Sequence, residues 1–258
     1  MEEQFAEIAL DYDRMFLRDI EADRNMLVTL FERYSAKTAL DCACGTGVHT
    51  EILAREGFHV VGSDASDHML EVARSKLSGA GLAVDLYKSS WRELPGVVPG
   101  RYDAVICMGN SLSLEPDGEA VVESLRGMHA MLNEGGFLLI SNTNADRQLA
   151  EMVGLEVVEP EPECFLLLVR DYGASKTTHR YFFIDTVSGE PSMRYYRFEL
   201  LNLTAEKMES FARLAGIDEF TLYGEKDFTP YSQYESERLI FVAGKSAGKD
   251  GKDVSKGS

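Results

Sequence analysis

The chain has 258 residues, of which 45% are hydrophobic and 27% charged, and its formal net charge is −17. This length and composition are typical of a globular protein with a sizeable core. The negative charge argues against a nucleic-acid partner, because phosphate binding requires a basic surface. No apolar run approaches the roughly 18 residues of a membrane span, and the start does not resemble a signal peptide. The four cysteines lack C-x-x-C spacing. We therefore expect no membrane association and a reduced, cytoplasmic location.

A ligand-binding loop is predicted early in the chain. Apolar residues recur at helical spacing in residues 2–34 and predict two helices. A buried strand is expected at residues 38–42, followed by a turn with Gly45 and Gly47 and a helix over residues 48–55. Glycine adopts positive φ without strain and lets the backbone approach a bound molecule. The exposed N–H groups at the start of the helix would face that molecule.

A carboxylate follows the next expected strand, residues 59–64. Asp64 lies roughly 20 residues after the loop begins, a spacing that suits an acid that binds ribose. The dinucleotide motif requires Gly or Ala where this chain has Thr50, and Asp41 would repel a phosphate. A nicotinamide-dependent oxidoreductase is therefore disfavoured. Asp41 would instead attract the ammonium of a cofactor with an amino-acid end, such as S-adenosylmethionine.

The following elements alternate between helix and strand. A helix over residues 66–77 with Ser66 as N-cap precedes strands at residues 83–88 and 102–108. A helix over residues 119–132 and a strand at residues 136–141 complete this part. Such alternation predicts an α/β fold with a parallel sheet and a ligand beyond the carboxyl ends of its strands.

The pattern changes at residue 145. Strands expected at residues 163–170, 180–186 and 193–203 form an antiparallel insertion. A helix over residues 204–215, with Thr204 as N-cap, precedes an antiparallel pair of strands at residues 219–223 and 238–243. The expected domains are N-terminal helices that form a cofactor lid (1–36), a core (37–145 and 204–244), a β cover (146–203) and a disordered tail (245–258).

Three stretches resemble the successive cofactor motifs of class I S-adenosylmethionine-dependent methyltransferases. They are Asp-Cys-Ala-Cys-Gly-Thr-Gly-Val at 41–48, Ser-Asp-Ala-Ser-Asp-His-Met-Leu at 63–70 and Tyr-Asp-Ala-Val-Ile-Cys-Met-Gly-Asn-Ser at 102–111. Within that superfamily the chain most resembles the glycine N-methyltransferase group, over residues 9–145 and again in Asp-Phe-Thr-Pro-Tyr at 227–231. The resemblance implies a Rossmann-like seven-stranded methyltransferase sheet with an antiparallel β insertion after the fifth strand. It also implies S-adenosylmethionine as cofactor and S-adenosylhomocysteine as product.

The resemblance also implies roles for individual residues in cofactor binding. Tyr12 and Arg18 would close over the cofactor, and Asp64 would accept hydrogen bonds from both ribose hydroxyls. Trp91 and Met69 would contact the adenosine, with plain core packing as the alternative for both. The full set of expected cofactor residues is Tyr12, Arg18, Asp41, Ala43, Gly45, Gly47, Asp64, Ala65, Met69, Ser90, Trp91, Met108 and Ser111.

The acceptor site is less defined by the sequence. Methyl transfer from a sulfonium needs alignment rather than strong acid or base groups, so no metal is expected. Asn110 is expected to hold the acceptor, with Tyr12 as a second catalytic residue. Glycine-methylating relatives carry a carboxylate-binding arginine where this chain has Thr143, which places glycine in doubt. The residues considered for the substrate site are Asn110, Thr143, Arg170, Tyr181, Arg197 and Tyr231.

The predicted function is methyl transfer from S-adenosylmethionine to the nitrogen of a small amine or amino acid by direct in-line displacement. An O- or S-methyltransferase of a small metabolite and a non-catalytic S-adenosylmethionine-binding protein are the alternatives. The expected partner is a small-molecule methyl acceptor, and a homo-oligomer is left open.

Overall fold

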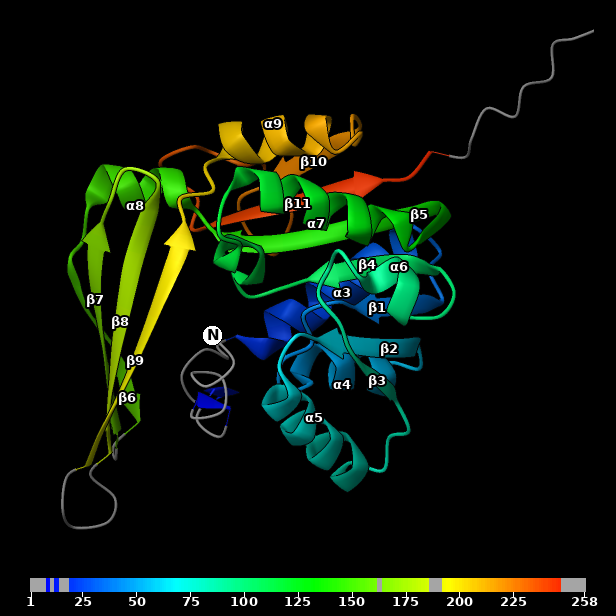
Figure 1. Ribbon diagram of the computed structural model, residues 1–258, viewed down its shortest axis with the longest axis horizontal. Coiled ribbons are helices and arrows are strands. Elements are labelled where there is room, and N and C mark those ends of the chain that lie inside the picture. Colours follow the sequence, from blue (N-terminus) through cyan, green and yellow to red (C-terminus); the bar gives the residue numbers. More distant parts are fainter. Residues whose placement is uncertain (1–7, 10–11, 14–18, 162–163, 186–191, 247–258) are drawn as a thin grey trace, which may run out of the picture.

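Two β-sheets organise the chain in the computed structural model, which describes residues 8–9, 12–13, 19–161, 164–185 and 192–246. The larger sheet has seven strands in the order β10-β11-β5-β4-β1-β2-β3, and the smaller has four in the order β6-β7-β8-β9. Figure 1 shows the four-stranded sheet standing beside the helix-covered seven-stranded sheet.

The seven-stranded sheet is parallel except at one edge. Its strands are β1 (Thr38–Asp41), β2 (His59–Asp64), β3 (Asp85–Lys88), β4 (Tyr102–Cys107), β5 (Leu132–Thr143), β10 (Phe220–Tyr223) and β11 (Arg238–Gly244). Strand β11 runs antiparallel to both β5 and β10, whereas β1 to β5 pair in parallel. This arrangement confirms the predicted α/β, Rossmann-like sheet with a final antiparallel pair. The carboxyl ends of β1, β2 and β4 therefore meet at one edge.

Helices cover both faces of this sheet. The helices among the described residues are α3 (Ile20–Arg33), α4 (Val48–Arg55), α5 (Asp67–Gly79), α6 (Leu94–Val97), α7 (Gly118–Ala130), α8 (Ala145–Glu151) and α9 (Ala205–Leu214), with a short 3-10 helix η1 at Ser111–Leu114. Of these, α8 lies beside the four-stranded sheet (Figure 1). Side chains of α3 and α4 pack on one face of β4 and β5, and those of α6, α7 and α9 pack on the other. Ser66 and Thr204 cap α5 and α9 as predicted, accepting hydrogen bonds from the backbone N–H of Met69 and Lys207.

The four-stranded sheet is antiparallel throughout and follows β5 in the chain. Its strands are β6 (Leu155–Glu161), β7 (Cys164–Tyr172), β8 (Lys176–Asp185) and β9 (Ser192–Leu201). One face carries buried apolar side chains, Leu166, Leu168, Phe183, Tyr196 and Phe198, which pack with Ile8, Ala9 and Met69. This face, called the inner face below, therefore turns toward α5 and the N-terminal segment.

Two elements of this region are not predicted from the sequence. Strand β6 runs into Pro160, and proline favours a loop assignment, but β6 is an edge strand, where proline is tolerated. Helix α8 has only seven residues and depends on a cap, because Asn144 accepts hydrogen bonds from the backbone N–H groups of Asp146 and Arg147. Most of the first helix expected in residues 2–34 lies outside the described residues.

Candidate active site

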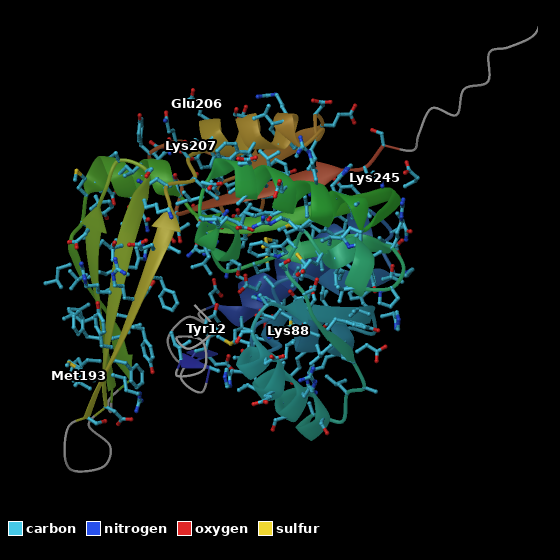
Figure 2. All side chains as sticks on the ribbon, in the orientation of Figure 1. Tyr12, Lys88, Met193, Glu206, Lys207 and Lys245 are labelled. Atoms are coloured by element: carbon cyan, nitrogen blue, oxygen red, sulfur yellow. The ribbon has the colours of Figure 1, made fainter. Side chains whose placement is uncertain are left out.

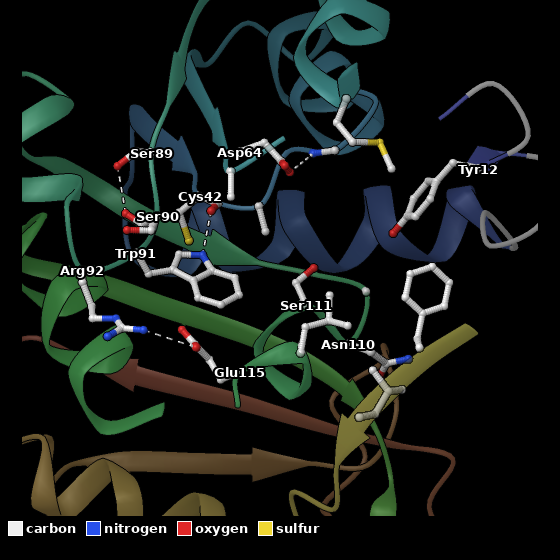
Figure 3. Close-up of a pocket in the computed structure, with 18 of the residues that line it drawn as sticks. Tyr12, Cys42, Asp64, Ser89, Ser90, Trp91, Arg92, Asn110, Ser111 and Glu115 are labelled. Carbon is white, nitrogen blue, oxygen red and sulfur yellow. Dashed lines mark hydrogen bonds and ion pairs between the residues drawn. The ribbon is translucent and has the colours of Figure 1, made fainter. Parts of the chain in front are cut away.

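A cavity of about 300 Å³ lies at the carboxyl ends of β1, β2 and β4. Residues that line it come from the N-terminal segment, the seven-stranded sheet, η1 and the inner face of the small sheet. They are Tyr12, Cys42, Ala43, Gly45, Asp64, Ala65, Met69, Ser89, Ser90, Trp91, Arg92, Gly109, Asn110, Ser111, Leu114, Glu115, Tyr181, Phe198 and Leu200. Figure 3 shows Ser89, Ser90, Trp91 and Arg92 at one end, and Tyr12 and Asn110 at the other.

The glycine loop is hydrogen-bonded to Asp64, the last residue of β2, at the middle of the cavity. Gly45 and Gly47 have φ values of 52° and 85°, the left-handed region that the sequence predicted for this turn. The N–H of Gly45 donates to Asp64 Oδ2 at 2.9 Å. The N–H of Ser66 donates to the other carboxylate oxygen at 2.9 Å. Asp64 is thereby fixed in orientation beside the loop.

The electrostatics of Asp64 fit a ligand that donates hydrogen bonds. Burial raises the pKa of its carboxyl group, and the backbone hydrogen bonds from Ser66, Gly45 and Ala65 offset that effect only in part. Each carboxylate oxygen can accept more than one hydrogen bond. Asp64 can therefore still accept two hydroxyl groups of a ribose in the cavity.

Asp41 does not line the cavity but lies buried behind the loop. Its Oδ2 accepts a hydrogen bond from the Thr50 hydroxyl at 2.8 Å. Thr50, which stands where the dinucleotide motif has Gly or Ala, is therefore a hydrogen-bond partner of Asp41. Oδ1 is buried and has no hydrogen-bond partner of normal geometry among the described residues. Burial raises the pKa of this carboxyl group. A nearby cation would stabilise its ionised form, so the site fits a cofactor with positive charge at this end.

The indole ring of Trp91 forms the wall of the cavity at the end where Ser89, Ser90 and Arg92 lie. The Nε1–H of Trp91 donates to the carbonyl oxygen of Cys42 at 2.7 Å, which fixes the ring plane across the end of β1. Ser90 donates through its hydroxyl to Glu93 at 2.6 Å. Met69 is 1% exposed and lines the cavity from α5. The flat ring of Trp91, with the polar Ser90 next to it in the chain, suits stacking with a purine ring.

Asn110 begins the wall at the opposite end. Its φ of 68° turns the chain sharply after β4, and its N–H donates to the carbonyl oxygen of Ser141. Its Oδ1 accepts a hydrogen bond from the backbone N–H of Thr143. Because this bond fixes the carbonyl end of the side chain, the amide nitrogen is the group that Asn110 can offer to a ligand.

Tyr12 reaches the same end from the N-terminal segment. A Cβ atom on Gly109 would lie 3.8 Å from the Tyr12 hydroxyl oxygen. Burial, and then the nearby carboxylate of Asp64, raise the pKa of Tyr12, so the phenol is neutral. The next residue, Asp13, accepts hydrogen bonds from Lys76 of α5 and from Thr46 of the glycine loop. This polar contact holds the segment against the cofactor loop.

The structure does not bring all of the expected residues to the cavity. Thr143 meets Asn110 through its backbone, and Arg170 binds Glu156 and the carbonyl oxygen of Val153. Arg197 binds Glu199 on the outer face of the small sheet. The Tyr231 hydroxyl lies 2.7 Å from Asn144 Oδ1 and 2.9 Å from Asp146 Oδ2. Gly47 and Met108 lie behind the lining, and Arg18 falls outside the described residues.

Several lining residues are not predicted from the sequence. Phe198 and Leu200 come from β9, and only the alternation of that strand could have placed them on its inner face. Arg92 and Glu115 lie 3.8 Å apart near Trp91, although they are distant in sequence. Cys42, Ser89, Gly109 and Leu114 complete the unpredicted set.

Comparisons with known proteins show which families this chain resembles. Residues 39–136 match the family model described as a methyltransferase domain. The chain is 33% identical over 129 residues to a glycine/sarcosine N-methyltransferase of Parasynechococcus marenigrum, an overlap that covers 50% of this chain and 46% of that protein. It is 27% identical over 240 residues to a glycine/sarcosine N-methyltransferase of Aphanothece halophytica, covering 87% of this chain and 82% of that protein. The chain thus spans about half the length of the first relative.

Solved structures show the same fold. An S-adenosylmethionine-dependent methyltransferase from Clostridium acetobutylicum superposes with a TM-score of 0.80 at 17% sequence identity, covering 93% of this chain and 98% of the other. The chain therefore has the Rossmann-like fold of these enzymes, and residues 39–136 match a methyltransferase domain. Its resemblance to class I S-adenosylmethionine-dependent methyltransferases, and to glycine/sarcosine N-methyltransferases among them, is confirmed.

Two further findings concern the described residues alone. No helix among them is long and apolar enough to cross a membrane. No group of three or more His, Cys, Asp or Glu side chains in that part of the chain is placed to hold a metal ion.

Proposed function

We propose that the protein binds S-adenosylmethionine in this cavity and transfers its methyl group to the nitrogen of a small amine or amino acid. The single observation that carries the proposal is the pairing of two unlike ends in one cavity. The Asp64 carboxylate lies between the indole of Trp91 at one end and the Asn110 amide and Tyr12 phenol at the other.

The chain supplies each part of a cofactor site. Asp64 would accept hydrogen bonds from the ribose hydroxyls, and Trp91 and Met69 would enclose the adenine. The glycine loop would lie against the amino-acid end, where the buried charge of Asp41 favours an ammonium. When bound, S-adenosylmethionine supplies an activated methyl group that leaves sulfur as the amine lone pair forms the new C–N bond, and S-adenosylhomocysteine remains.

The lining residues favour nitrogen over oxygen as the acceptor atom. A hydroxyl acceptor needs a base to remove its proton, whereas a neutral amine attacks with its own lone pair. Other roles are proposed or observed for the lining carboxylates: Asp64 would bind the ribose, and Glu115 accepts the Ser124 hydroxyl and lies 3.8 Å from Arg92. Asn110, Tyr12 and Tyr181 instead orient the acceptor and exclude water, which suffices for an amine.

The experiment that tests this proposal follows the methyl group from labelled S-adenosylmethionine. The purified protein would be incubated with glycine, sarcosine, other amino acids, simple amines, phenols and thiols, and mass spectrometry would identify the labelled atom. Label on a nitrogen of one acceptor class is the expected result. Label on oxygen or sulfur alone, or binding of the cofactor without transfer to any compound, would contradict it.

A further inference from the structure

The small sheet has a second apolar face, opposite its inner face and called the outer face below. Side chains of the two faces alternate along each strand. Antiparallel pairing aligns the outer side chains in rows that cross the sheet. Two adjacent rows, together called the outer apolar patch below, are Val157, Leu167, Phe182 and Tyr195, and Phe165, Ile184 and Met193. Figure 2 shows Met193 on the side of the small sheet that faces away from the seven-stranded sheet.

The strands of this sheet have the composition of strands that are covered on both faces. An antiparallel sheet with one face in water usually alternates apolar and polar residues. Here residues 165–169 read Phe-Leu-Leu-Leu-Val and residues 181–184 read Tyr-Phe-Phe-Ile. Continuous apolar runs of this kind are typical of strands that are buried on both sides. We therefore expect the outer face to be covered as well.

The described residues do not cover it. Every side chain of the outer apolar patch is exposed or only half-buried. Val157 is 59% exposed and Met193 is 63% exposed. In Figure 1 the small sheet forms the left side of the molecule, and no helix or strand of the described residues lies beyond it. The cover must therefore come from outside this part of the chain.

The patch has the size of a protein interface. With the flanking Leu155 and Val169, it exposes on the order of 600–700 Å² of surface, whereas the largest apolar patch on a typical monomer is about 300–600 Å². A standard interface buries roughly 800 Å² on each partner. A second sheet laid on this face would bury nearly the area that a stable dimer needs.

The charges beside the patch favour an apolar partner. Arg180 binds Asp171, and Arg197 binds Glu199, so the charges that border the patch are paired within the outer face. The patch itself contains no charged residue. The formal net charge of −17 also disfavours an anionic membrane surface. An uncharged protein surface of similar shape is therefore the partner that fits.

A second copy of the chain has such a surface. Two sheets pack face to face about 10 Å apart with interdigitating side chains. A two-fold axis parallel to the strands, between β7 and β8, would place Val157 opposite Tyr195 of the second copy and Leu167 opposite Phe182 of the second copy. Smaller side chains would then meet larger ones, as close packing requires.

We propose that the protein forms a homodimer in which the outer apolar patches of two copies pack against each other as a two-layer β-sandwich. Tyr181 and Phe198, which line the cavity, lie on the inner face of the same strands. The contact therefore leaves the cavity of each copy uncovered. This inference goes beyond the proposed function and does not depend on it.

Sedimentation velocity over protein concentrations from about 1 to 100 µM tests the association. The unaltered protein should be mostly dimeric, with a Kd below about 10 µM, as an interface of this size allows. Val157→Lys and Met193→Lys each place an unpaired charge in the contact and should raise this Kd by about 100-fold or more. Leu214→Lys in α9 is the matched control, because Leu214 is 61% exposed on another surface. Its Kd should stay within about twofold.

Crosslinking provides a second readout that does not place a charge in the sheet. Val157→Cys combined with Tyr195→Cys puts two thiols opposite each other across the proposed axis. A bis-maleimide that spans about 10 Å, the distance between packed sheets, should join two copies of this double variant in high yield. Either single variant, and Leu214→Cys, should give little crosslinked dimer.

The outcomes that would overturn the proposal are distinct. A protein that stays monomeric at the highest concentration, or a dimer that Val157→Lys and Met193→Lys leave intact, would do so. A monomer that binds phosphatidylcholine vesicles through the patch would identify a lipid surface as its cover instead. A monomer whose patch amides are protected from hydrogen exchange would identify another segment of the same chain. Either result would also overturn the homodimer.

Discussion

Asp64 has a structural role in the site and is also the residue that we propose to bind the ribose. Its carboxylate binds the backbone N–H groups of Gly45 and Ser66, so it connects the glycine loop to the start of α5. The same carboxylate lines the cavity. A single substitution at this residue therefore tests whether the cavity is a ribose site.

Asp64→Asn should weaken binding of S-adenosylhomocysteine by about 10- to 100-fold, because hydrogen bonds to a charged acceptor are the stronger kind and asparagine lacks the charge. Titration calorimetry measures this affinity. Asp85→Asn, an exposed aspartate on β3, is the matched control and should bind normally. Unchanged affinity in Asp64→Asn, with an unaltered urea midpoint, would contradict a ribose-binding role.

Cofactor affinity should also depend on pH through this residue. Burial raises the pKa of Asp64 above the ordinary 3.8, so the carboxyl group takes up its proton at a higher pH than an exposed aspartate does. Protonation removes an acceptor for the ribose hydroxyls. Affinity for S-adenosylhomocysteine should therefore fall as the pH is lowered, starting above the ordinary aspartate range. Asp64→Asn should show a flatter profile, and an identical profile would contradict this assignment.

At the scale of elements, the site depends on contacts between segments that are far apart in the chain. The N-terminal segment is held by Asp13, which binds Lys76 of α5 and Thr46 of the glycine loop. Helix α7 packs closely against the segment that carries Trp91, since Gly127 leaves no room there for a side chain. Each contact can be removed without changing a residue that lines the cavity.

Lys76→Met should speed the dissociation of S-adenosylhomocysteine by about two- to fivefold, because loss of the ion pair lets the segment with Tyr12 open more often. Stopped-flow fluorescence of Trp91, the only tryptophan, follows the release. Lys88→Met removes a surface ion pair with Asp67 and should leave the rate unchanged. Equal rates in both variants would show that the Asp13 contact does not retain the ligand.

Gly127→Ala should lower the free energy of unfolding by more than about 2 kcal/mol, because the new Cβ would lie 2.0 Å from the carbonyl oxygen of Trp91. Gly79→Ala in α5 is the matched control, since no atom lies within 4 Å of its Cβ position. That change should stabilise the helix by about 0.5–1 kcal/mol. Urea unfolding measures both, and a similar small effect for the two would contradict the close packing of α7.

At the scale of the whole molecule, the sequence predicts the repeating half well. Gly45, Gly47 and Asp64 lie in motifs whose spacing is set by local strand and helix geometry, and the order of those elements determines the parallel sheet. Capping by Ser66 and Thr204 is equally local and is confirmed. Tyr181, one of the residues considered for the substrate site, lines the cavity.

The rest could not be predicted because it depends on tertiary placement. Arg170 and Arg197 lie on strands of the small sheet, but which face each strand turns inward follows from packing against Met69 and Ile8. The sequence shows that Asp41 follows a strand and carries a carboxyl group. It does not show that this side chain is buried behind the glycine loop instead of lining the cavity. Residue spacing alone does not contain this information.

We propose that one cavity holds S-adenosylmethionine with its reactive end toward Asn110 and Tyr181. A crystal structure with S-adenosylhomocysteine bound tests this placement most directly. We expect ribose hydroxyls on Asp64, adenine beside Trp91 and the sulfur atom facing Asn110 and Tyr181. A ligand bound elsewhere, or one whose sulfur points away from these two residues, would contradict this placement.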